Sequence, residues 1–173
     1  MNRLTLFLIA WILPFTVIQG YAQISYSIKV ETGLLKYQYN TVDVDPGPNW
    51  KGYYLHKQNG IDFNIINGIE VNKKLFAGIG IGYINVEGTN GFSTFSEVEY
   101  LPLKARLTPL VNLKIGYSHL WNQYENGTGT GLGEFGVGLN YRLAEKIGVY
   151  AKSGFTVTQQ SLLIPIRLGI RIR

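Results

Sequence analysis

The sequence contains no cysteine and only two histidines, His56 and His119. Without cysteine the chain cannot form the disulfides that small exported domains often need, and a structural zinc site is not expected. No cluster of Asp and Glu has the spacing of metal ligands, so the sequence predicts neither a metal nor another cofactor. The 16 Lys and Arg exceed the 11 Asp and Glu, but they form no basic stripe with interleaved aromatics, which argues against a nucleic-acid partner.

Long apolar runs are also scarce, and the one that stands out is at the N-terminus. Leu4 to Ile18 follows Arg3, and Gly20 and Ala22 fit the small-x-small pattern of a cleavage site. An N-terminal membrane anchor is the alternative, but the run of about 15 residues is short for a spanning helix. We predict a signal peptide over residues 1–22 and one exported domain over residues 23–173.

No other stretch is long enough for a transmembrane helix. If the exported domain enters a membrane, it must therefore be a closed barrel, because open sheet edges cannot be satisfied in hydrocarbon. The segment Ser161–Arg173 shows the pattern most clearly, since aliphatic residues alternate with Arg167, Gly169 and Arg171. In a soluble sandwich the arginines would face water and the aliphatic side chains a core. In a transmembrane barrel the aliphatic side chains face lipid and the arginines face the lumen.

The rest of the chain favours the barrel, because alternation with a period of two recurs in eight segments. The expected strands cover residues 23–34, 60–71, 75–86, 94–107, 110–121, 131–143, 147–157 and 161–173. Short turns at 72–74, 108–109 and 144–146 fall at one end, and longer loops at 39–58, 87–93 and 122–130 fall at the other. The prediction is an all-β, eight-stranded, antiparallel, up-and-down transmembrane barrel.

The expected lumen is narrow, so its side chains must fill it and satisfy one another. Gly78, Gly80 and Gly82 face inward on one strand, where they would leave room for large side chains from other strands. Charged residues at the other inward positions form a predicted lumen charge network, which plugs the barrel more plausibly than it conducts ions: Lys29, Glu31, Asp62, Glu70, Lys104, Arg106, Lys114, Glu134, Arg142, Lys152, Arg167 and Arg171.

The segments 76–83 (FAGIGIGY), 100–103 (YLPL) and 164–171 (IPIRLGIR) resemble the small eight-stranded outer-membrane barrels of Bacteroidetes-type Gram-negative bacteria, and more loosely those of the OmpA and OmpX type. That resemblance covers the whole domain after residue 22. It implies the outer membrane as the location, membrane lipid as the surroundings and the barrel-assembly machinery as a partner. Barrels of this family usually end on an aromatic residue, whereas this chain ends Arg171-Ile172-Arg173.

The sequence assembles no catalytic site, and we expect no enzyme. Ser118 and His119 invite comparison with lipid A deacylases, but adjacent strand residues point to opposite faces and cannot hydrogen-bond directly. The 39–58 loop offers Trp50, Tyr53 and Tyr54 for contact with an extracellular partner. We therefore predict a structural, adhesion or surface-interaction role. The alternatives are an outer-membrane lipid-modifying enzyme and a soluble, lipocalin-like barrel that binds an apolar ligand.

Overall fold

A computed structural model describes residues 23–41, 55, 59–123 and 125–173. The predicted signal peptide, most of the predicted 39–58 loop and the residues Trp50, Tyr53, Tyr54 and His56 lie outside this part of the chain. In the described part no helix is long and apolar enough to cross a membrane.

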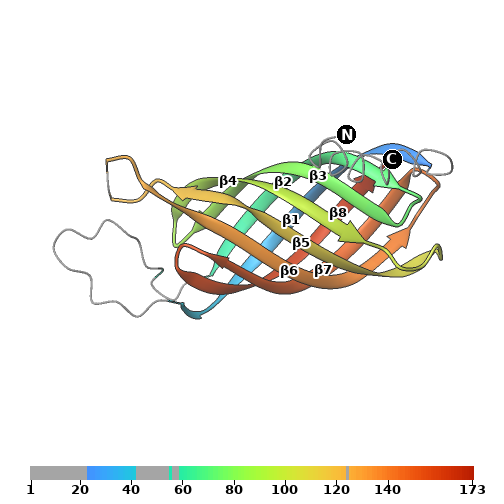
Figure 1. Cartoon of the computed structure of the whole chain (residues 1–173). Coiled ribbons are helices and arrows are strands. Elements are labelled where there is room, and N and C mark those ends of the chain that lie inside the picture. Colours follow the sequence, from blue (N-terminus) through green and yellow to red (C-terminus); the bar gives the residue numbers. More distant parts are fainter. Residues whose placement is uncertain (1–22, 42–54, 56–58, 124) are drawn as a thin grey trace, which may run out of the picture.

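The described residues form a closed barrel in which each strand pairs antiparallel with its sequence neighbours and β8 returns to β1. Figure 1 shows the strands wrapping obliquely around one cylinder. This confirms the predicted eight-stranded antiparallel barrel. The strands are β1 (Ile24–Asn40), β2 (Gly60–Val71), β3 (Leu75–Val86), β4 (Thr89–Tyr100), β5 (Leu107–Leu120), β6 (Thr128–Arg142), β7 (Ile147–Thr158) and β8 (Ser161–Ile172).

The two faces of the wall differ as the alternation predicts. Ile79 and Ile81 of β3, Ile115 of β5 and Leu168 of β8 are all more than 60% exposed on the outside. The side chains between such residues point inward and are largely buried. A soluble barrel would bury its aliphatic face, so this wall is inverted with respect to a water-soluble protein.

The boundary between β4 and β5 differs from the prediction. The expected strand 94–107 and turn 108–109 are wrong, because β4 ends at Tyr100, residues 101–106 connect the strands and Thr108 already lies in β5. Tyr100 pairs with Leu75, the first residue of β3, and the Leu101 amide donates to the Lys74 carbonyl at 2.6 Å. β4 therefore ends opposite the start of β3, and Pro102 falls in the connection.

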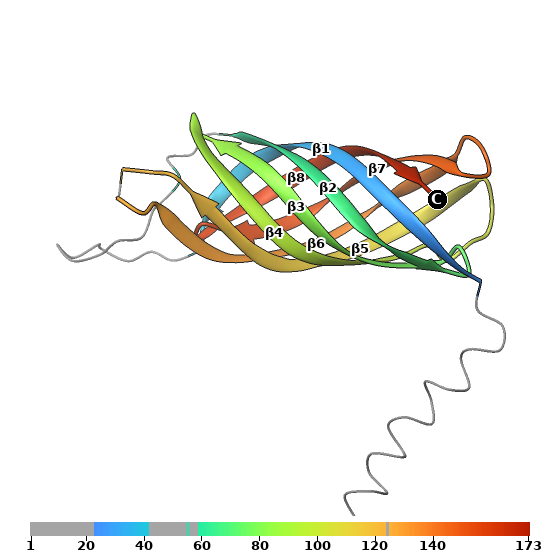
Figure 2. The ribbon, with the colours of Figure 1, turned by 90° about the horizontal axis from the view of Figure 1, so that it is seen from above.

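Both termini of the barrel lie at one end, together with the connections 72–74, 101–106 and 143–146 (Figure 2). We call this the terminal end, and the other the distal end. The predicted distal loop 87–93 is wrong, because β3 and β4 are joined by a two-residue turn at Glu87 and Gly88, both with positive φ. The 101–106 connection is longer than this distal turn, so the predicted division into short and long connections holds only in part.

The inward glycines of β3 make room for large side chains, as the sequence indicates. A Cβ atom added to Gly80 would collide with the ring of Phe95 and would lie 3.0 Å from Cγ1 of Ile66. Phe95 is itself enclosed by a buried apolar cluster with Ile66, Phe76 and Leu132. Close packing across the lumen therefore depends on the missing side chain at Gly80.

Replacing Gly80 with valine is expected to lower the free energy of unfolding by about 1–3 kcal/mol, because the enclosed Phe95 ring must move. Urea titration of the barrel in detergent micelles would measure the loss. The matched control is Gly131→Val on β6, where an added Cβ meets nothing within 4 Å. That substitution should change stability by no more than about 0.5 kcal/mol. Equal effects at both positions would contradict the packing role.

Candidate functional site

The lumen holds a connected network of ion pairs that balances in charge. Every member contacts at least one partner of opposite sign within 4.0 Å. The six cations of this lumen network are Lys29, Lys114, Lys152, Arg167, Arg171 and Arg173, and its six anions are Glu31, Asp62, Glu70, Glu97, Glu99 and Glu134.

Glu31 lies at the centre of this network. Its carboxylate accepts hydrogen bonds from Lys114 and from the Tyr150 hydroxyl, the latter at 2.9 Å. Lys152 Nζ lies 2.9 Å from Glu31 Oε2 and 2.7 Å from Glu97 Oε1, so Lys152 joins β1 to β4 across the lumen. Because Glu31 is 1% exposed, water cannot replace these partners, and each must stay in place to offset the cost of burying the charge.

Two further groups extend the network in opposite directions. Toward the distal end, Arg167 contacts Asp62 and donates to Glu134 at 2.6 Å. Toward the terminal end, Lys29 joins Glu97 to Glu99 with distances of 3.1 and 2.7 Å. Arg171 contacts both Glu99 and Glu70, and Arg173 Nε lies 2.8 Å from Glu70 Oε1. The ion pairs thus run along the barrel without a gap.

Three residues of the predicted network lie elsewhere. Lys104 and Arg106 are exposed in the 101–106 connection, because β4 ends before them. Arg142 keeps its inward parity but sits at the terminal end, where it donates to the carbonyl oxygens of Lys104 and Ala105 at 3.4 Å. These cations lie at the rim of the barrel and contact no acid of the lumen network.

The structure adds Glu97, Glu99 and Arg173, which sequence reasoning missed. Glu97 and Glu99 are 1% and 0% exposed on the inward face of β4. The outward face of that strand carries Thr94 and Ser96 among its apolar residues, so its alternation is weak. The predicted network contained more basic than acidic residues. Because buried charges in a lumen need partners of opposite sign, this excess could have indicated that acidic residues were missing from the prediction.

Buried apolar clusters share the lumen with the ion pairs. Leu35, Ile84, Val86, Leu120 and Leu163 form a buried cluster near the distal end, joined by Leu55. Leu101, Leu110 and Tyr150 form another near the terminal end.

Among the ion pairs, the hollow bounded by Asp62, Lys114 and Arg167 measures about 10 Å³, which is room for one water at most. Side chains therefore fill this part of the described lumen.

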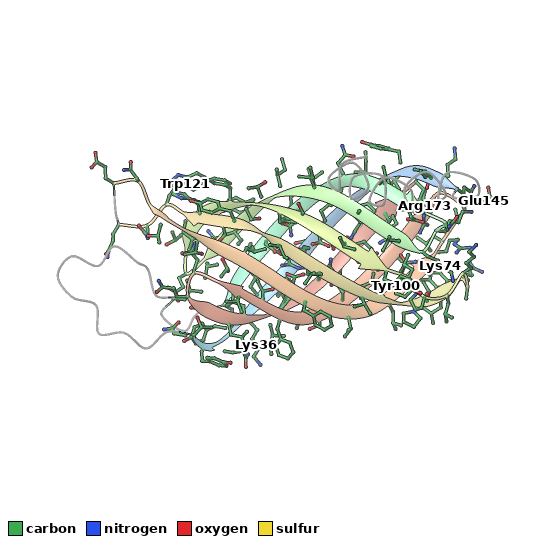
Figure 3. The ribbon with its side chains drawn as sticks, viewed as in Figure 1. Lys36, Lys74, Tyr100, Trp121, Glu145 and Arg173 are labelled. Carbon is green, nitrogen blue, oxygen red and sulfur yellow. The ribbon has the colours of Figure 1, made fainter. Side chains whose placement is uncertain are left out.

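Ser118 and His119 are on opposite sides of the wall. Ser118 is buried in the lumen and hydrogen-bonds Thr158. His119 lies outside among Phe92, Tyr117 and Trp121, with ring centroids 5.6, 6.4 and 5.8 Å away. Figure 3 places Trp121 at the distal end, opposite Tyr100 and Arg173. This cluster has the composition of an interfacial aromatic girdle.

Among the described residues, no group of three or more His, Asp or Glu is placed to hold a metal ion.

Comparison with known proteins identifies the fold but no relative in sequence. No protein-family model and no curated protein matches the chain. Among solved structures, the barrel is similar to Neisserial surface protein A, with a TM-score of 0.61 and 10% identity over 86% of this chain and 97% of that chain. It is also similar to the N-terminal β-barrel domain of OprF from Pseudomonas aeruginosa, with a TM-score of 0.53 and 13% identity over 87% of this chain and 98% of that domain. The fold is that of small outer-membrane barrels.

Proposed function

We propose that this protein is an integral outer-membrane barrel with a structural, adhesion or surface-interaction role, and that its lumen does not conduct ions. The observation that carries the proposal is the inverted wall. Outward faces such as Ile79, Ile115 and Leu168 are aliphatic and exposed, while the charges are buried and balanced inside. Water would disfavour such an outer surface, and lipid would favour it.

Export through a cleaved signal peptide over residues 1–22, delivery by the barrel-assembly machinery and membership of the Bacteroidetes-type group belong to this proposal. So does a contact role for Trp50, Tyr53 and Tyr54 toward an extracellular partner. The similarity to Neisserial surface protein A supports the fold that these proposals require.

The protein is expected to stay with the membrane fraction after osmotic shock and to need detergent for extraction. Reconstituted in liposomes loaded with potassium, it should release no more ion than protein-free liposomes, because paired charges and buried apolar clusters fill the described lumen. A potassium electrode would measure the release, with an open porin as the positive control. Recovery in the shock fluid would contradict the membrane location, and steady release would contradict the closed lumen.

We further propose that the barrel catalyses no reaction on lipid. The described residues that would carry such chemistry, Ser118 and His119, are separated by the wall. Incubation of the barrel with lipid A, followed by mass analysis, should show no change. Loss or gain of an acyl chain would contradict this proposal and favour a lipid-modifying enzyme.

A further inference from the structure

On the proposed membrane location, we propose that the outer wall carries a binding groove for one anionic phospholipid of the leaflet at the terminal end. The groove is a hollow of about 620 Å³ that crosses β6, β7, β8 and β1 on the outside of the barrel. This volume falls in the range of small-molecule sites. The lipid's acyl chain would occupy the hollow, and its phosphate would contact cations at the rim.

Short side chains create the hollow. Val149 and Ala151 on β7 and Val30 and Thr32 on β1 line it, and they leave a depression that Leu or Ile at the same places would fill. The single hydroxyl among them is already satisfied, because Thr32 Oγ1 donates to the Asp62 carbonyl at 3.0 Å. Along these four side chains the hollow therefore offers an acyl chain van der Waals contact and no unpaired polar group.

Taller side chains bound the hollow on two sides. Leu107 of β5 and Tyr141 of β6 line it toward the terminal end, and Phe63 of β2 lines it on the far side. Leu107 and Tyr141 are paired residues of neighbouring strands, so they stand side by side. The hollow is thus confined across the wall, which favours one seated chain over the disordered chains of bulk lipid.

Positive charge stands where this hollow meets the terminal end. The Arg106 guanidinium lies over the Tyr141 ring, with Cζ 5.0 Å from the ring centroid. Lys104 lies with Arg106 in the 101–106 connection, Arg142 is the last residue of β6, and Lys146 lies in the 143–146 connection. We call these four residues the basic rim. Among the described residues, no ion pair links the basic rim to a carboxylate. The only acid in these connections is the exposed Glu145.

An anionic phospholipid matches both parts of this surface at once. Its phosphate would meet Arg106 while its acyl chain runs over Tyr141 and Leu107 into the hollow. Arginine suits this position because its planar guanidinium can stack on an aromatic ring and still bind phosphate. A second barrel seated in the hollow would use the apolar surface, but it would leave the basic rim without a partner.

The barrel, extracted from membranes in non-ionic detergent, can be titrated with phosphatidylglycerol or phosphatidylcholine of equal chain length and followed by native mass spectrometry. One phosphatidylglycerol is expected to bind each barrel, about tenfold more tightly than phosphatidylcholine. Ala151→Phe should abolish binding of both lipids by filling the hollow. Arg106→Gln should weaken only phosphatidylglycerol, about five- to tenfold.

Two control variants test the location of the site. Ala77→Phe places the same ring on an exposed outward alanine of β3, across the barrel from β7. Lys74→Gln removes a cation at the terminal end outside the basic rim. Both should bind phosphatidylglycerol like the unchanged protein. Circular dichroism and protease resistance would show that each variant keeps the barrel.

Equal binding to Ala151→Phe and Ala77→Phe would overturn the groove, and an unchanged lipid preference in Arg106→Gln would overturn the headgroup contact. Loss of a dimer in Ala151→Phe, without loss of bound lipid, would assign the hollow to a second copy. Insertion into liposomes, measured separately, would show whether the membrane location itself fails.

Discussion

Replacing Arg167 with methionine is expected to lower the free energy of unfolding by about 3–5 kcal/mol, because the change leaves buried Asp62 without a cation and takes from buried Glu134 the nearer of its two cations. Arg167 contacts Asp62 and Glu134, and both are at most 4% exposed. Denaturant titration of the barrel in detergent micelles or lipid vesicles, followed by tryptophan fluorescence, would measure the loss.

Two further variants make this result specific. Lys104→Met removes an exposed cation of the basic rim and should cost no more than about 0.5 kcal/mol. Adding Glu134→Gln to Arg167→Met should recover part of the loss, since it removes one of the two buried carboxylates that lost Arg167. If Arg167→Met were as stable as the unchanged protein, water would have to reach the centre of the lumen, and the plugged barrel would be wrong.

Replacing Leu113 with arginine is expected to cost about 2–4 kcal/mol in a bilayer, because the guanidinium would enter hydrocarbon. Leu113 points outward near the middle of β5 and is 48% exposed. Reversible unfolding in lipid vesicles would measure the change. The same substitution on the surface of a soluble barrel would have almost no effect. The size of the measured loss in stability therefore shows whether lipid or water surrounds the wall.

Depth provides the control for this second experiment. Leu107 is the first residue of the same strand and is also exposed on the outside, so Leu107→Arg should cost only about 0–1 kcal/mol near the interface. Equal and small costs at Leu107 and Leu113 would favour the soluble, lipocalin-like alternative. A larger cost at Leu107 than at Leu113 would mean that the hydrocarbon layer surrounds a different part of the barrel than proposed.

Strong alternation made most of the wall predictable. In β2, β3 and β8 the outward positions are nearly all aliphatic or aromatic. Because side chains alternate along a strand, one outward residue is enough to predict that residues such as Asp62, Glu70 and Arg167 point inward. The bounds of β2 and β3 were predicted to the residue. Turns at 72–74 and 144–146 were predictable too, because short polar segments separate the alternating runs there.

The same reasoning failed at β4 because its outward face is only weakly apolar. Leu101, Leu103 and Leu107 offered a stronger apolar alternation than Thr94 and Ser96 did. Since these leucines have the opposite parity, choosing them turned every residue of the strand to the other face. Glu97 and Glu99 were lost from the predicted lumen by that single error. Pairing with β3 decides the strand's end, and a single sequence does not contain that information.

The partners in the lumen network come from distant parts of the chain. Lys114 contacts Glu31 across 83 residues of sequence, Arg167 contacts Glu134 across 33 and Asp62 across 105, and Lys29 contacts Glu99 across 70. Few of these charges can therefore find a partner of opposite sign before the later strands have joined the sheet. An open, half-assembled sheet would expose them to hydrocarbon along with its unpaired edges. If the barrel lies in the outer membrane as proposed, entry into the bilayer and the pairing of β1 with β8 are expected to occur as one cooperative step, and such long-range pairing is slow without a catalyst.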